Sequence, residues 1–209
     1  MIHCIGDSHA SIFCGSESMQ PEWPARSNDT LPHFKSYRIG PATAYQLDGK
    51  TPILDKITIL LNKETDSLLF CFGEVDIRAH LKKQMDLQKK SVQSIVKECV
   101  DRYFKTIIHY KSQEINVMVW GPIASWNEEK PYPGPSFGSC LERNELTREF
   151  NKYSKELCDK WGIEFITIFD KMLLPNGKTD PTYLDGSGIH LSNNSIPLIL
   201  KTFKERKLI

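Results

Sequence analysis

The chain has 209 residues and a mass of 24.0 kDa, with 27 Lys and Arg against 26 Asp and Glu, so its formal net charge is +1. This balance gives no support for nucleic-acid binding through bulk charge or for a polybasic membrane anchor. No apolar run approaches the roughly 18 residues of a membrane span, and the first residues lack the basic and then apolar pattern of a secretory signal. We expect one soluble, cytoplasmic domain over residues 1–209, with no nucleic-acid partner and no membrane span.

Five short apolar runs predict β-strands, and most of them are followed by glycine or a turn. These runs are Ile2–Ile5, Tyr37–Ile39, Leu68–Phe72, Ile115–Trp120 and Ile163–Phe169. Most are apolar without alternation, which is typical of strands that are covered on both faces in a parallel sheet.

Long helical patterns separate the later strands. An unbroken apolar stripe at helical spacing runs through residues 92–108. A second helix is expected to begin at Ser139, with Glu142 at capping-box spacing, and to end at Gly162. A last helix tolerates Pro197 because this proline falls in or near the first turn. Alternating strands and helices predict a flavodoxin-like three-layer α/β/α sandwich around a parallel sheet of about five strands.

The six cysteines are spread along the chain without a C-x-x-C pair, and several lie in apolar segments. A zinc cluster or a disulfide scaffold needs closer or denser spacing. We interpret them as reduced thiols in the core. They are Cys4, Cys14, Cys71, Cys99, Cys140 and Cys158.

Polar and glycine positions follow the predicted strands, at the edge where ligands bind in open α/β sheets. Ser8 follows the first strand, Gly40 the second and Gly73 the third, while Asp185 and His190 follow the fifth. A serine hydroxyl needs a base to remove its proton, and an imidazole suits that task. The backbone N–H of Ser8 and close approach at the two glycines suit acyl transfer. The plainer alternatives are that Ser8 is a helix N-cap and Asp185 an ordinary turn residue.

The order of these motifs resembles the SGNH (GDSL-like) hydrolase superfamily, in a divergent form. The matching blocks are Gly6-Asp7-Ser8, Gly40, Gly73-Glu74-Val75-Asp76 and His190, and they span essentially the whole chain. The resemblance implies that Ser8 is the nucleophile and His190 the base, and that a nearby aspartate orients the histidine. It also implies an oxyanion hole that is built from serine and glycine N–H groups and an asparagine side chain.

Two positions depart from the family pattern. Val75 stands where the family has the oxyanion asparagine, so we expect Arg78 to supply the missing donor and Glu74 to shape the pocket. The alternative is that Arg78 and Glu74 pair with each other or with a helix end. Ser187 stands three residues before the histidine, where the family has aspartate; Asp185, five before it, is the expected partner. The alternative is a Ser–His dyad in which a backbone carbonyl orients the ring.

The expected function is hydrolysis of a small ester, with an acyl group on a carbohydrate as the substrate and without a metal or cofactor. Transfer of the acyl group to a sugar hydroxyl is a close variant. A non-catalytic glycan-binding or scaffold domain is a further alternative, which Val75 and the displaced aspartate support. Asp7 and His9 also imitate the Asp-x-His pair of a metallophosphoesterase, although its other ligand motifs are missing from the sequence. The sequence does not indicate an oligomeric state.

Overall fold

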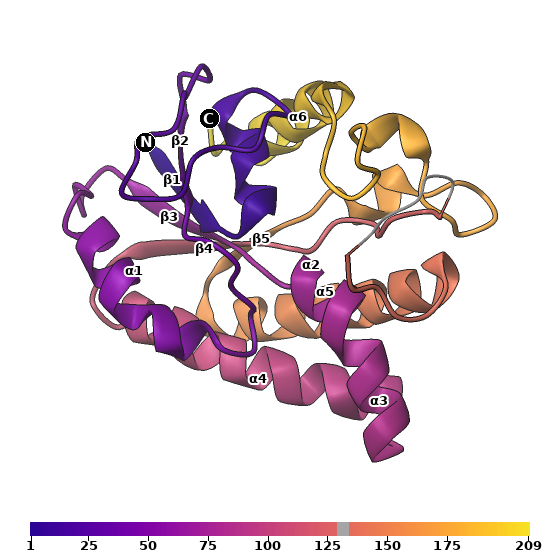
Figure 1. Ribbon diagram of the computed structural model, residues 1–209. Coiled ribbons are helices and arrows are strands. Elements are labelled where there is room, and N and C mark those ends of the chain that lie inside the picture. Colours follow the sequence, from indigo (N-terminus) through magenta and orange to yellow (C-terminus); the bar gives the residue numbers. More distant parts are fainter. Residues whose placement is uncertain (129–133) are drawn as a thin grey trace.

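All five strands lie in one parallel sheet of order β2-β1-β3-β4-β5, which confirms the predicted fold class (Figure 1). The computed structural model describes residues 1–128 and 134–209. The strands are β1 Ile2–Gly6, β2 Phe34–Arg38, β3 Ser67–Cys71, β4 Asn116–Trp120 and β5 Glu164–Ile166. β2 begins and ends earlier than its apolar run suggested, and β5 covers only part of the predicted segment.

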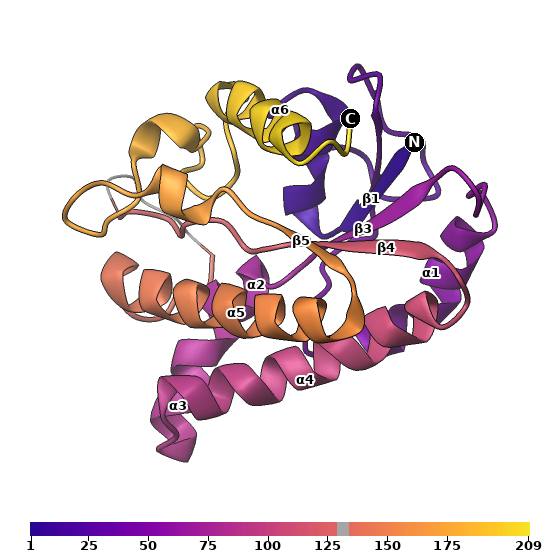
Figure 2. The same ribbon diagram turned by 180° about the vertical axis from the view of Figure 1, so that it is seen from behind.

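Helices cover both faces of the sheet. α1 (Thr51–Thr58), α4 (Val92–Lys111) and α5 (Cys140–Trp161) lie on one face. The 3₁₀-helix η1 (Ser8–Cys14) and α6 (Ile196–Glu205) lie on the other, as the reverse view also shows (Figure 2).

Each face of the sheet has its own apolar core. On β3, Leu68 and Phe70 pack into the core under α4, whereas Leu69 and Cys71 pack into the core under η1 and α6. Because both faces are buried, the strands need apolar residues at every position, which is why their sequences lack alternation. All six cysteines are buried and free, as the sequence predicted.

The predicted helix boundaries are confirmed by their capping geometry. Ser139 caps α5 and forms the reciprocal capping box with Glu142, and Gly162 ends the helix at a φ of 61°. Pro197 lies in the first turn of α6, where its missing N–H has no intrahelical partner to lose. Among the described residues, no helix is both long enough and apolar enough to cross a bilayer.

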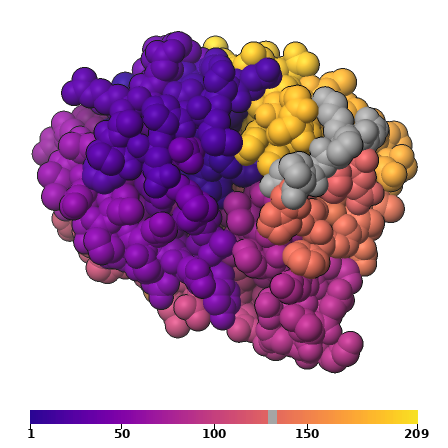
Figure 3. Space-filling model, viewed as in Figure 1, coloured from indigo at the N-terminus to yellow at the C-terminus, as the bar shows by residue number. Residues whose placement is uncertain are grey.

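One helical run changes its pitch near the carboxyl end of β3. It consists of α2 (Glu74–Asp76), the π-helical turn η3 (Ile77–Leu81) and α3 (Lys82–Gln88). The segment between β5 and α6 folds into three short 3₁₀ turns. They are η4 Phe169–Met172, η5 Pro181–Tyr183 and η6 Asn193–Ser195. Segments from the two ends of the chain lie side by side on one face of the molecule (Figure 3).

Candidate active site

The side chains of Ser8 and His190 meet at the carboxyl end of β1. The Ser8 hydroxyl oxygen lies 2.9 Å from Nε2 of His190, although the two residues are 182 positions apart in the sequence. The side chain of Asp7, not that of Ser8, caps η1 by accepting the N–H of His9 at 2.8 Å. The capping interpretation of Ser8 is therefore wrong, and its hydroxyl is directed to an imidazole instead.

A tight turn presents His190 to Ser8. Asp185 accepts at Oδ1 the N–H groups of Ser187 (3.0 Å) and Gly188 (3.1 Å), and its own N–H donates to the His190 carbonyl at 2.8 Å. Leu184 and Leu191 flank this turn as an antiparallel bridge. Asp185 is thus the residue that closes the turn.

Contact between Asp185 and the His190 ring is mainly indirect. Asp185 Oδ2 lies 3.6 Å from His190 Nδ1, which is longer than a hydrogen bond. The Ser187 hydroxyl lies 2.5 Å from Asp185 Oδ1 and 3.3 Å from His190 Nδ1. If Nε2 accepts the Ser8 proton, Nδ1 carries the ring proton and donates it to the Ser187 oxygen, while Ser187 donates to the carboxylate. The sequence analysis treated Ser187 only as the displaced aspartate position.

His190 is held in its neutral form. Burial, followed by the charge of the neighbouring His9, lowers the pKa of His190 to about 4, despite the opposing attraction of Asp185. A neutral imidazole with a lone pair on Nε2 is the form that removes a serine proton. The electrostatic surroundings therefore suit a general base at neutral pH.

A buried chain of charged side chains lies behind His190. The His9 ring centroid is 4.8 Å from that of His190, and His9 Nε2 lies 2.8 Å from Glu74 Oε2. Glu74 in turn binds Arg78 through Nε at 2.7 Å and Nη2 at 3.2 Å. His9, Glu74 and Arg78 are 8%, 4% and 5% exposed. Although burial opposes its ionisation, Glu74 has its pKa lowered to about 2 by the charges of His9 and Arg78, and Glu74 raises the pKa of His9.

The pairing of Arg78 with Glu74 agrees with the alternative that the two side chains bind each other. The three guanidinium nitrogens of Arg78 bind Glu74 and the Pro135 carbonyl, the latter at 3.0 Å, so they are not directed at the Ser8 hydroxyl. These contacts do not support an oxyanion role for Arg78 in place of the asparagine, and that role stays a prediction. His9 is the contact that the sequence analysis missed. The available signals were its position next to Ser8 and the i, i+4 spacing of Glu74 and Arg78.

Gly40 and Gly73 flank Ser8 on the neighbouring strands. Ile39 donates its N–H to the Gly6 carbonyl at 3.0 Å, which brings Gly40 beside the end of β1. Gly40 has a φ of +82°, and a Cβ there would lie 2.5 Å from Glu22 Oε1. Gly73 has a φ of +116°, and its Cβ would press on Pro122 and Phe150. Both positions therefore require glycine.

Two backbone N–H groups at this edge can donate a hydrogen bond to a ligand. Within residues 1–128 and 134–209, the N–H groups of Ser8 and Gly40 donate to no other residue. Val75 offers no side-chain donor and lines a hollow together with Pro41. Beside Ser8 and His190 lies another hollow of about 180 Å³, which Ile12 and Met19 also line.

The Asp-x-His pair that raised the alternative of a metal site consists of Asp7 and His9. Asp7 accepts the backbone N–H of His9 at 2.8 Å, and Nε2 of the His9 ring lies 2.8 Å from Glu74 Oε2. In the part of the chain that the structure describes, no group of three His, Cys, Asp or Glu residues is arranged to hold a metal ion.

Comparison with known proteins identifies solved structures with a similar fold but no family model or curated protein with a matching sequence. No family model matches the chain, and no curated protein matches it. A search of the solved structures gives 76 matching chains. One is a GDSL-like lipase from Bacteroides thetaiotaomicron, with 11% identity and a TM-score of 0.63, covering 98% of this chain and 86% of the lipase.

Two further structures agree with this match. A member of the lipolytic G-D-S-L family from Veillonella parvula has 14% identity and a TM-score of 0.53, with 98% of this chain and 96% of that chain covered. A carbohydrate acetylesterase from Sinorhizobium meliloti has 16% identity and a TM-score of 0.53, with 100% and 99% covered. The chain has the fold of these SGNH (GDSL-like) hydrolases.

Proposed function

We propose that the protein is a serine esterase that removes a small acyl group from a carbohydrate through an acyl-enzyme. The observation that carries this proposal is the 2.9 Å contact between the Ser8 hydroxyl and His190 Nε2. This contact lies at the sheet edge where ligands bind in this fold class. The pKa of the same histidine, His190, is lowered to about 4.

In the proposed reaction, the Ser8 oxygen attacks the ester carbonyl while His190 removes the serine proton. The N–H groups of Ser8 and Gly40 stabilise the negative oxygen of the tetrahedral intermediate. Protonated His190 then gives its proton to the leaving alcohol, and acyl-Ser8 remains. A water molecule, activated by His190, releases the carboxylic acid and restores the serine.

The proposed acyl group is short. The hollow beside Ser8 and His190 measures about 180 Å³, below the roughly 300–1,000 Å³ of sites for drug-sized ligands. The solved carbohydrate acetylesterase with the same fold supports an acetyl group on a sugar. Acetyl esters are therefore the substrates to test first.

Hydrolysis of 4-nitrophenyl acetate tests the chemistry without requiring the natural alcohol. We expect measurable turnover in the wild type and a loss of about 10⁴-fold in kcat for Ser8→Ala and for His190→Ala, since the two side chains act as one unit. The matched controls are Ser18→Ala and His33→Ala, because both side chains are exposed. If Ser8→Ala retains wild-type turnover, the proposal fails.

A further inference from the structure

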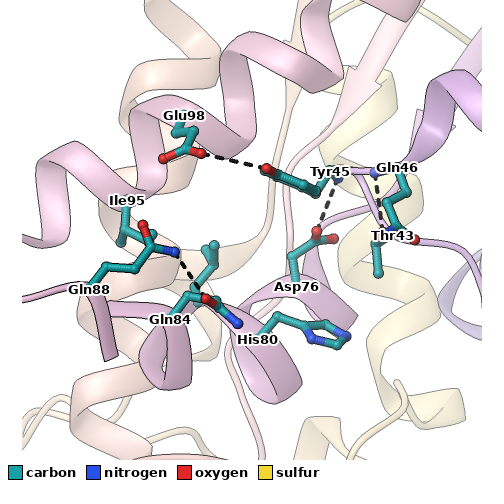
Figure 4. A pocket seen from close by; sticks show the side chains of 10 residues that line it. Thr43, Tyr45, Gln46, Asp76, His80, Gln84, Gln88, Ile95 and Glu98 are labelled. Carbon is teal, nitrogen blue, oxygen red and sulfur yellow. Dashed lines mark hydrogen bonds between the residues drawn. The ribbon is translucent and has the colours of Figure 1, made fainter. Parts of the chain in front are cut away.

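A second cavity lies away from Ser8 and His190, on the α4 side of the sheet edge. It has a volume of about 300 Å³ and lies between residues 43–46, the helical run through η3 and α3, and α4 (Figure 4). In Figure 4 the side chains of Gln84 and Gln88 stand opposite Tyr45 and Asp76, and Glu98 closes the α4 side.

One wall of this cavity is held rigidly. Asp76 accepts the backbone N–H groups of Ala44 at 2.7 Å and Tyr45 at 3.0 Å. Arg102 lies over the Tyr45 ring, 4.2 Å from its centroid, and donates to the Tyr45 carbonyl at 3.0 Å. A wall that is fixed in advance loses little conformational freedom when a ligand binds.

The opposite wall contains the π-helical turn η3. A π turn interrupts the α-helical hydrogen-bond pattern, is rare, and occurs frequently at functional sites. Both His80 and Leu81 of this turn line the cavity. The irregular turn is thus an observation, independent of the cavity volume, that points to a ligand here.

The cavity offers uncharged hydrogen-bonding groups. Gln88 Nε2 donates to Gln84 Oε1 at 2.9 Å, which leaves the Gln84 N–H groups and the Gln88 oxygen available. In the described part of the chain, the Gln46 carboxamide has no hydrogen-bond partner. Leu81 and Ile95 add apolar surface.

The two acidic residues that line the cavity, Asp76 and Glu98, already have partners within the protein. Lys90 binds Glu98 at 2.5 Å. Burial raises the pKa of Asp76 to about 7, and both of its oxygens accept backbone N–H groups. Burial lowers the pKa of His80, as do the charges of Lys83 and Arg78. Such a site suits a neutral polyhydroxyl ring better than a phosphate or a carboxylate.

An adjoining hollow of about 510 Å³ extends from this cavity to Pro41, the residue after Gly40. The two spaces share Thr43, Gln46 and His80 as lining residues, and the hollow extends to Pro41 and Val75. Pro41 follows Gly40, and Val75 lies two residues after Gly73. β2 and β3 flank β1 in the sheet, so Pro41 and Val75 both follow strands that neighbour the strand leading to Ser8.

We infer that the cavity bounded by Tyr45, Gln46, His80, Gln84 and Gln88 binds a neutral sugar ring, the alcohol part of the ester that Ser8 cleaves. This inference rests on the proposed function, because it assigns the other half of the same substrate. The carboxamides hydrogen-bond the sugar hydroxyls, and the apolar side chains contact its C–H face.

Binding of simple glycosides tests the site without requiring ester cleavage. The probes are methyl glycosides of neutral hexoses, deoxyhexoses and N-acetylhexosamines, with methyl glucuronoside as the charged comparison, measured by ligand-observed NMR on the whole chain. We expect at least one neutral glycoside to bind with a Kd on the order of 1 mM. Gln84→Leu should weaken it about fivefold, as the loss of a hydrogen bond predicts. Gln93→Leu, an exposed glutamine of α4 outside the cavity, should leave the Kd unchanged.

A kinetic comparison separates this site from the chemistry at Ser8. Gln84→Leu should raise KM about fivefold for an O-acetylated form of the bound glycoside and leave KM and kcat for 4-nitrophenyl acetate unchanged. If the chain has no esterase activity, the proposed function fails while the glycoside binding still tests the cavity. The inference is overturned if no neutral glycoside binds, if the glucuronoside binds more tightly, or if folded Gln84→Leu binds like the wild type.

Discussion

The hydroxyl oxygen of Ser187 lies 3.3 Å from Nδ1 of His190, at the sequence position where the SGNH pattern has an aspartate. Its proton is directed at Asp185 Oδ1, 2.5 Å away. A neutral hydroxyl that is polarised by a carboxylate orients an imidazole less strongly than the carboxylate itself, because it stabilises less of the positive charge that forms on the ring. This site thus keeps the orientation of His190 through a serine relay.

Replacing Ser187 by alanine should lower kcat for 4-nitrophenyl acetate by about 10–100-fold, less than the ~10⁴-fold cost of losing a direct orienting aspartate. Ser187→Asp should restore or exceed wild-type kcat, since it places a carboxylate beside Nδ1. Thermal unfolding of both variants checks that the turn survives. Wild-type kcat in Ser187→Ala would show that the serine does not orient the ring.

Asp185→Asn keeps an oxygen for the N–H groups of Ser187 and Gly188 but removes the negative charge. We expect kcat to fall by about 10²-fold or more with little change in KM, because the imidazolium loses its counter-charge only as the reaction proceeds. A variant that is folded and fully active would reduce Asp185 to a turn residue and leave a Ser–His dyad.

The pH dependence of kcat/KM should report the depressed pKa of His190. The base works only when it is deprotonated, so activity rises with pH through the folded-state pKa, which is about 4 here and not the roughly 6.5 of an ordinary histidine. Activity should therefore be flat from about pH 6 upward. An inflection near 6.5 in the wild type would contradict the effect of burial and of His9.

His9→Gln tests the charge behind the base. Removing the positive charge next to His190 should raise the pKa of His190 and move the acidic limb of the profile toward 6.5. Asp7, Glu74, Arg78 and Asp185 also face this region, and all of them remain in the variant. The control is His33→Gln, an exposed histidine, which should leave the profile unchanged. A profile that does not move in His9→Gln would show that His9 does not tune the base.

Arg78→Ala should primarily affect stability. The substitution leaves Glu74 buried with one cationic partner instead of two, and breaking a buried pair costs about 3–5 kcal/mol. Urea unfolding measures the free-energy change, with exposed Arg26→Ala as the control. A variant with wild-type stability and a reduced kcat would contradict this prediction and support Arg78 as an oxyanion donor.

Much of the fold was readable from the sequence because its signals are local. The apolar runs marked the strands, and Ser139, Glu142 and Gly162 marked the ends of α5. α1 and the π turn were not predicted, since α1 is short and a π turn has no distinct sequence pattern. The π turn packs against α5, a helix far from it in the sequence.

The site was only partly readable for the same reason. The order of the motifs placed Ser8 and His190 together, and the i, i+4 spacing of Glu74 and Arg78 is compatible with their pairing. The contact of Arg78 with the Pro135 carbonyl depends on the fold. The relay through Ser187 depends on the hydroxyl rotamer in one tight turn. Neither is a property of residue spacing, so both required three-dimensional coordinates.

Covalent labelling of the native chain with a fluorophosphonate tests the central claim most directly, because only an activated serine is phosphonylated rapidly. The account predicts one adduct, on the peptide that contains Ser8, absent in Ser8→Ala and formed far more slowly in His190→Ala. Ser18→Ala should label like the wild type. Absence of labelling in the folded wild type, or an equal adduct in Ser8→Ala, would contradict the assignment of Ser8 as the nucleophile.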